Sequence, residues 1–158
     1  MAPLVIDLRK AEDPRDAIHR AVAALADGKL VALPTETVYG VAASALSSEA
    51  VNRLLDAKQR DGKPLALAIK SADDALDYVP TMSPLAQRLA RRCWPGPLTM
   101  VLPDAHQDSV ITRLPEDVQA VINPGGKVGL RVPGHELTLQ MLRLSACLLY
   151  TSPSPRDE

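Results

Sequence analysis

The chain has 158 residues, which is the usual length of one domain, and its formal net charge of -1 gives no global basic signature for nucleic acid. The two cysteines, Cys93 and Cys147, make no disulfide framework and fit a reducing compartment. We find no apolar stretch of about 18 residues and no leader pattern, so we expect a cytoplasmic protein without a membrane span.

Apolar periodicity predicts strands that alternate with helices. In chain order we expect a strand at 4–8, a helix at 13–29, a strand at 29–34, a helix at 47–60, a strand at 64–69, helices at 71–79 and 83–94, a strand at 97–102, a loop with one short helix over 103–126, a strand at 127–132 and a helix at 135–144. The first helix has Asp13 as its N-cap, Pro14 at its first position and Gly28 as its stop. The alternation indicates an α/β or α+β fold whose mixed sheet is covered by helices.

The residue composition changes after Leu144. The alternation of strands and helices predicts another strand at this point. The stretch Cys147–Asp157 is what a common transposase sequencing adapter gives on translation. We therefore interpret 146–158 as a non-native tail and 1–145 as the native domain, incomplete at its C-terminus. A disordered tail rich in Ser and Pro is the alternative.

Three cations stand close together in the stretch "DAKQRDGKP". If the preceding helix ends at Lys58, then Lys58 and Arg60 can converge on one anion, and Lys63 follows within six positions. Arginine offers a planar fork for phosphate oxygens, and lysine offers a compact point charge. A solvated basic loop is the alternative interpretation.

Two further cations occur in "KVGLRVPGH". Lys127 and Arg131 are four residues apart in a predicted strand, so their side chains share one face. Two cations on an otherwise apolar strand need an anionic partner or a water-filled cleft, whereas the alternative is an ion pair with a nearby acid. The three histidines show no metal-ligand spacing, so we expect no protein-held metal site.

Hydroxyl groups cluster in "PTETVYG", directly after the strand predicted at 29–34. Thr35, Thr37 and Tyr39 alternate and can face one side together, at a strand end of the kind where α/β sheets bind ligands. The alternative is a turn whose hydroxyls satisfy local backbone groups. The stretch "WPGPLT" is typical of a rigid structural turn into a strand.

Taken in order, "LVALPTETVYGVAA", "DAKQRDGKPLALAI", "RCWPGPLTMVL" and "VGLRVPGHEL" closely resemble the YrdC-like family, the threonylcarbamoyl-adenylate synthases. The resemblance covers about residues 5–145. It implies a mixed, strongly twisted sheet around a basic concave cleft. It also implies a nucleotidyltransferase that makes threonylcarbamoyl-AMP and pyrophosphate from L-threonine, bicarbonate or CO2, and ATP. Other proteins would then move the threonylcarbamoyl group to adenosine 37 of tRNAs reading ANN codons.

The resemblance also implies a role for individual residues. Threonine would be bound by Thr35, Thr37 and Arg131, and ATP by Lys58, Arg60, Lys63 and Lys127, with Lys58 and Arg60 as the catalytic pair and Mg²⁺ bridging the phosphates.

Some features depart from the family pattern. The family's Ser-Ala-Asn motif is missing after the last predicted helix, and Ala68 stands where some members carry His. We therefore expect this chain to bind ATP weakly and turn over poorly. The alternatives are a non-catalytic relative that binds double-stranded RNA or tRNA, and a related carbamoyl-transfer module of a larger maturation protein.

Overall fold

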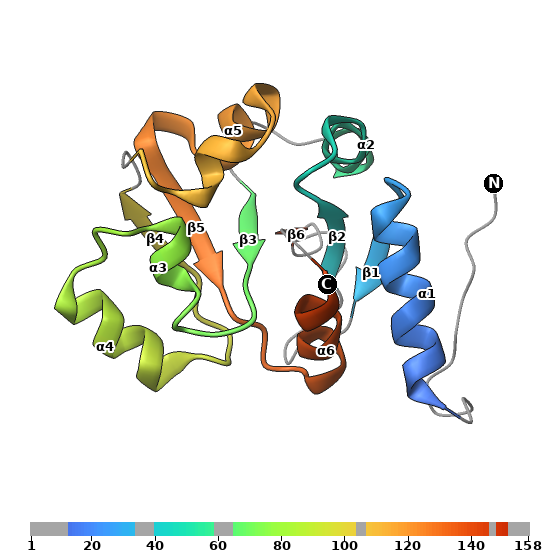
Figure 1. Ribbon diagram of the computed structural model, residues 1–158, viewed down its shortest axis with the longest axis horizontal. Coiled ribbons are helices and arrows are strands. Elements are labelled where there is room, and N and C mark those ends of the chain that lie inside the picture. Colours follow the sequence, from blue (N-terminus) through green and yellow to red (C-terminus); the bar gives the residue numbers. More distant parts are fainter. Residues whose placement is uncertain (1–12, 34–39, 59–64, 104–106, 146–147, 152–158) are drawn as a thin grey trace.

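The computed structural model describes residues 13–33, 40–58, 65–103, 107–145 and 148–151, so the strand predicted at 4–8 lies outside the described residues. Six strands form one sheet in the order β1-β2-β6-β3-β5-β4 (Figure 1). The strands are β1 Val31–Leu33, β2 Gly40–Ser44, β3 Ala66–Ala68, β4 Met100–Pro103, β5 Lys127–Arg131 and β6 Leu148–Thr151. The helices are α1 Pro14–Ala26, α2 Ser48–Lys58, α3 Ala75–Tyr78, α4 Pro84–Cys93, α5 Glu116–Ile122 and α6 Glu136–Leu144, with short 3-10 turns η1 Val110–Arg113 and η2 Pro124–Gly126.

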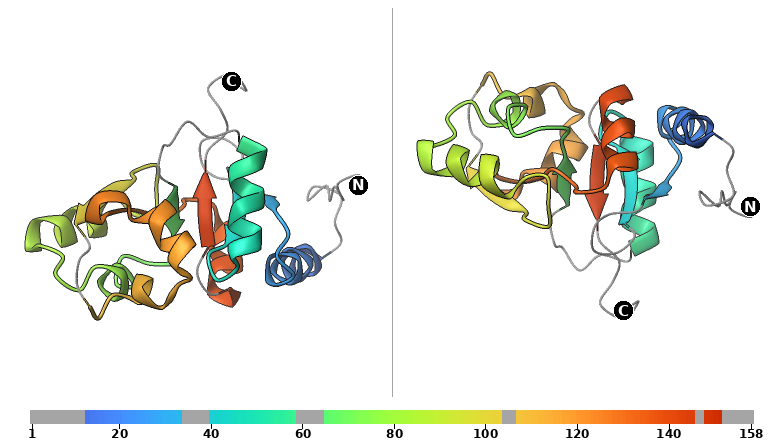
Figure 2. Two further views of the ribbon diagram at one scale, coloured as in Figure 1. Left: turned by 90° about the horizontal axis from the view of Figure 1, so that it is seen from above. Right: turned by 90° about the horizontal axis from the view of Figure 1, so that it is seen from below.

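The sheet is mixed, which confirms the predicted α/β class. β3 and β5 run parallel, and all other neighbouring strands are antiparallel. Helices α3, α5 and α6 lie on one side of the sheet, as the views of Figure 2 show. Within the described residues, no helix is long and apolar enough to cross a membrane.

The predicted helix ends are confirmed by their hydrogen bonds. Asp13 accepts the backbone N–H of Arg15 at 3.0 Å, and the Arg15 guanidinium lies 3.2 Å from the same carboxylate. The hydrogen bond from the Arg15 side chain is the main cause that lowers the pKa of Asp13 below its ordinary value, and the bond from the Arg15 backbone adds to it. Gly28 follows α1 with a φ of 80°, a left-handed conformation that favours glycine and ends the helix. The Ser83 hydroxyl caps α4 by accepting the N–H of Ala86 at 3.1 Å.

The core lies between the sheet and its helices. Leu67 and Leu130, on the neighbouring strands β3 and β5, are fully buried, as is Leu54 of α2. Helix α5 packs on β5 through its buried residues Val118 and Ile122. Burying these aliphatic side chains is the main force that holds the helices to the sheet.

The structure shortens the helix predicted at 71–79 to Ala75–Tyr78, and it differs from the predicted elements in three further places. It adds β2, whose sequence "GVAAS" consists mostly of small residues with weak strand preference. It adds β6, which lies between β2 and β3 and is built from residues interpreted above as tail. In the region expected to hold one short helix, it has η1 before α5, where Ser109 accepts the N–H of Ile111 and donates to the Tyr78 carbonyl.

Candidate functional site

One side of β3, β5 and β4 is left open by the described helices. The cross-strand pairs place Ala66, Gly129 and Val101 on the same face, because side chains alternate along a strand. Val101 is 64% exposed there, whereas Leu130 points to the opposite side and is fully buried. The Thr99 methyl group belongs to this face too, since a Cβ on Gly129 would lie 3.5 Å from it. We call Ala66, Thr99, Val101 and Gly129 the open face.

All four residues of the open face have short side chains or none. A flat ligand can therefore approach the backbone of β5 closely at Gly129. The alternation along β5 also puts Lys127 and Arg131 on the same side, one at each end of the strand. The open face thus combines a surface of small side chains with a cation at each end of β5.

Arg131 is the buried cation of this arrangement. The residue is 7% exposed, and its Nε donates to the Gly96 carbonyl at 3.3 Å. Lys127, in contrast, is exposed. A buried guanidinium needs hydrogen-bond acceptors to compensate for lost hydration, so the Gly96 carbonyl helps to hold Arg131 in place.

The turn that supplies this carbonyl, in the stretch "WPGPLT", is held by hydrogen bonds of its own residues and to the end of β5. The Trp94–Pro95 peptide bond is cis, and the buried Trp94 indole donates to the Leu98 carbonyl at 2.7 Å. The Gly96 N–H donates to the Val132 carbonyl at 2.9 Å, which ties the turn to the end of β5. A Cβ on Gly96 would come within 2.6 Å of the Cys93 carbonyl, so any other residue would force the backbone to shift.

Most of the other predicted site residues lie outside the described residues. Thr35 and Thr37 belong to the segment that links β1 to β2, and Arg60 and Lys63 belong to the segment that links α2 to β3. Lys58 is the last described residue of α2, within the helix predicted at 47–60, and its side chain is outside the description. The structure therefore places Lys127 and Arg131 on one strand and leaves the other assignments as predictions.

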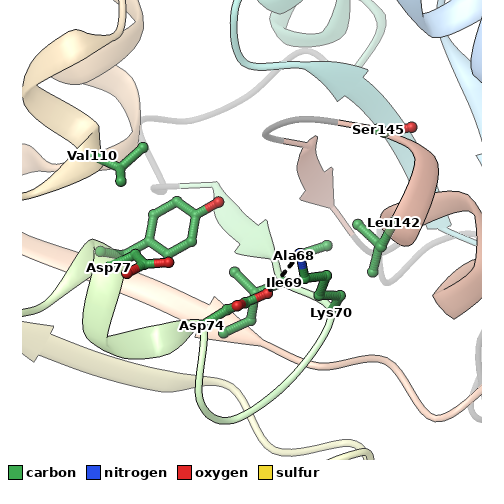
Figure 3. Close-up of a pocket in the computed structure, with 9 residues that line it drawn as sticks. Ala68, Ile69, Lys70, Asp74, Asp77, Val110, Leu142 and Ser145 are labelled. Atoms are coloured by element: carbon green, nitrogen blue, oxygen red, sulfur yellow. Dashed lines mark ion pairs between the residues drawn. The ribbon is translucent and has the colours of Figure 1, made fainter.

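A separate cavity of about 170 Å³ opens at the carboxyl end of β3, between α3 and α6 (Figure 3). Its polar lining includes Lys70, Asp74, Asp77 and Ser145. Lys70 and Asp74 form an ion pair at 3.6 Å, and the buried Ser145 hydroxyl has no hydrogen-bond partner among the described residues. Neither Lys127 nor Arg131 lines this cavity, so it is distinct from the open face.

The cavity nevertheless adjoins the Arg131 end of the sheet. Ala68, which lines it, is the register partner of Arg131, and the N–H of Ile69 donates to the Arg131 carbonyl at 2.9 Å. The cavity therefore offers room for one small group at the Arg131 end of the sheet.

The sequence alone did not identify the open face or the acceptor of Arg131. Thr99 and Gly96 belong to a stretch that was interpreted as purely structural, and small residues such as Ala66 and Gly129 carry no chemical signal. β6 follows α6 where the family resemblance calls for the strand that carries Ser-Ala-Asn. In the sequence, β6 is followed by Ser152, Pro153 and Ser154, which lie outside the described residues.

Comparison with known proteins extends the likeness over most of the chain. Residues 23–158 match the family model Sua5_yciO_yrdC, which carries the description "Telomere recombination". The threonylcarbamoyl-AMP synthase of Pyrococcus abyssi is 41% identical over 130 residues, which cover 81% of this chain and 35% of that protein. The threonylcarbamoyl-AMP synthase of Bacillus subtilis is 34% identical over 142 residues, covering 89% of this chain and 38% of the relative.

A solved structure agrees with these relatives. The crystal structure of P. abyssi Sua5 complexed with L-threonine is similar with a TM-score of 0.75 and 34% sequence identity, and the match covers 90% of this chain and 40% of that chain. This chain thus spans between a third and a half of the length of these three proteins. On the evidence of its motifs, its mixed sheet and these matches, the chain belongs to the Sua5, YciO and YrdC family.

Proposed function

We propose that this chain carries the substrate-binding sheet of a threonylcarbamoyl-AMP synthase. The reaction takes L-threonine, bicarbonate or CO2, and ATP, and gives threonylcarbamoyl-AMP and pyrophosphate. The observation that carries the proposal is the 41% identity to a relative named for this activity. The buried Arg131 at the end of the open face supports it, because a fixed guanidinium suits the carboxylate of an amino acid.

The roles proposed for the residues follow the charge of each substrate. Thr35, Thr37 and Arg131 bind L-threonine, so that hydroxyls and a guanidinium meet its polar groups. Lys58, Arg60, Lys63 and Lys127 bind the triphosphate of ATP, and Lys58 and Arg60 act as the catalytic pair. In this proposal the nucleotide lies across the open face, where Gly129 has no side chain that would block its approach.

In the proposed reaction, bonds form and break only between the substrates, and the protein forms no covalent intermediate. The threonine amine attacks CO2 and loses a proton to form a carbamate; starting from bicarbonate, the same C–N bond forms with release of water. A carbamate oxygen then attacks the α-phosphorus of ATP, the bond to the β-phosphate oxygen breaks, and pyrophosphate leaves. The cations neutralise the triphosphate and hold the reacting groups in line, which accounts for the lack of an evident nucleophile or general base.

Magnesium enters this proposal as part of the ATP substrate. Among the described residues no group of three or more His, Cys, Asp or Glu side chains could hold a metal ion. Phosphate oxygens and water are ordinary ligands of Mg²⁺, so the nucleotide itself can carry it.

The proposed partners follow from the product. Threonylcarbamoyl-AMP is a mixed anhydride, so a second protein must accept the threonylcarbamoyl group and pass it to adenosine 37 of tRNAs reading ANN codons. Contact with tRNA or another double-stranded RNA, and a cytoplasmic location, belong to the same proposal.

The test combines product detection with binding. With the purified chain in excess over ATP, we expect threonylcarbamoyl-AMP to appear by mass spectrometry only when L-threonine and bicarbonate are both present. Lys58→Ala should lower its yield, whereas Lys29→Ala, which changes an exposed lysine before β1, should not. If no adenylate forms and calorimetry detects neither ATP nor L-threonine binding, the proposal fails.

A further inference from the structure

Helix α4 exposes an apolar stripe beside unpaired arginines. Leu85 is 65% exposed and Leu89 is 43% exposed. Arg88 and Arg92 share their side of the helix, because residues three, four and seven apart line one face. Within the described part of the chain, neither arginine has a hydrogen bond or ion pair. We call Leu85, Arg88, Leu89 and Arg92 the basic face.

Helix α3 and the turn before it show the opposite charge around another exposed leucine. Leu76 is 39% exposed, and Asp73 and Asp77 on either side of it are exposed as well. In the segments that the structure describes, Asp73 and Asp77 make no ion pair, although the neighbouring Asp74 pairs with Lys70 at 3.6 Å. We call Asp73, Leu76 and Asp77 the acidic face.

The two faces have opposite charge, and among the described residues no ion pair joins one to the other within a copy of the chain. Helices α3 and α4 lie at the same end of the molecule, away from α1 (Figure 1). Each face presents exposed leucine together with unpaired charge of one sign. Leucine exposed beside arginine suits a protein surface better than a phosphate backbone, because an aliphatic side chain gains nothing from phosphate.

We propose that a second copy of this chain covers both faces. The basic face of one copy would pack against the acidic face of the other, and a two-fold axis would repeat the same contact in reverse. Each copy then supplies arginines to one contact and aspartates to the second. The exposed leucines lie between the ion pairs and lose their contact with water.

This inference does not depend on the proposed function. None of the residues of either face belongs to the open face or to the proposed substrate-binding set, although Asp77 also lines the cavity between α3 and α6. The position of α4 still gives the dimer a consequence, since α4 leads directly into the Trp94–Gly96 turn whose carbonyl accepts Arg131. A partner seated on α4 would therefore restrain the helix next to that turn.

Sedimentation over a range of micromolar concentrations, with the full chain, tests the proposal. We expect a reversible dimer that weakens as salt is raised, because the contact is rich in surface charge. The double substitutions Arg88→Glu with Arg92→Glu, and Asp73→Lys with Asp77→Lys, should each give a monomer. Arg20→Glu with Arg143→Glu, which changes two exposed arginines on other helices, should leave the dimer intact.

Mixing the two monomeric variants gives the decisive result. One contact of the mixed pair sets the introduced glutamates of the first variant against the introduced lysines of the second. The other contact sets native aspartates against native arginines, so both contacts are complementary again. The mixture should therefore recover the dimer that each variant has lost. A wild-type monomer at every concentration, a dimer that survives either reversal, or a mixture that stays monomeric would each overturn the proposal.

Discussion

Arg131 carries a permanent charge on a side chain that is almost fully buried. Removing a guanidinium from water is costly unless acceptors replace the lost hydration, and the Gly96 carbonyl at 3.3 Å is one of them. That carbonyl is held in turn by the hydrogen bond of Gly96 to Val132 and by a position that admits only glycine without a backbone shift. The orientation of Arg131 is thus set by residues of another element.

The prediction at this scale concerns Arg131→Gln. The substitution keeps a polar side chain but removes the charge, so we expect L-threonine affinity to fall by about 10- to 100-fold, the usual worth of a hydrogen bond to a charged group. Calorimetric titration with L-threonine measures the change, and circular dichroism checks the fold.

Arg143→Gln is the matched control for that prediction. Arg143 is exposed on α6 and pairs with Glu136 at 3.2 Å, so its loss should leave threonine binding unchanged. Equal affinities for the wild-type chain and Arg131→Gln would show that Arg131 has no role in binding threonine.

At the scale of elements, β5 connects the core to the open face. Leu130 points toward the helices and is fully buried, while its neighbours Gly129 and Arg131 point to the other side of the sheet. Helix α5 packs on β5, and α5 is tied to α2 where the Ser48 hydroxyl donates to Asp117 at 2.8 Å. The packing of α5 against one side of β5 therefore fixes the position of Gly129 and Arg131 on the other side.

Leu130→Ala should consequently destabilise the protein by about 2–5 kcal/mol, because it leaves a cavity at the centre of the core. Urea unfolding followed by circular dichroism gives the free energy of unfolding for both proteins. Leu46→Ala removes an exposed leucine and should change the same quantity by less than about 0.5 kcal/mol. If the two substitutions cost the same, β5 is not the packed strand described above.

At the scale of the whole molecule, the sheet depends on β6. This strand pairs with β2 on one side and with β3 on the other, so it joins β1 and β2 to the remaining strands. Without it, both neighbouring strands would expose unpaired backbone edges that favour aggregation. The residues of β6 are also those interpreted from the sequence as adapter-derived, and that interpretation stays a prediction.

Sequencing the source gene from genomic DNA decides this question. We expect the codons after residue 145 to differ from those of Cys147–Asp157 and to encode a strand that carries a Ser-Ala-Asn motif. A chain rebuilt with the genomic continuation should form threonylcarbamoyl-AMP faster than the present one. Genomic codons identical to the present ones would refute the adapter interpretation.

Local sequence patterns determined most of the helices and the fold class. Asp13, Pro14 and Gly28 delimit α1, and Ser83 with Pro84 starts α4, because caps and backbone preferences act within one turn of the chain. The sequence also predicted that Lys127 and Arg131 share a face, since that follows from the two-residue period of a strand.

Only the tertiary structure decided what depends on contacts between distant segments. β2 has a sequence without a strong strand signal, and its pairing with β1 and β6 makes it a strand. The open face exists because Ala66, Thr99, Val101 and Gly129 come from three neighbouring parts of the sheet. The carbonyl that receives Arg131 lies 35 residues away in the chain, so no local pattern could assign it.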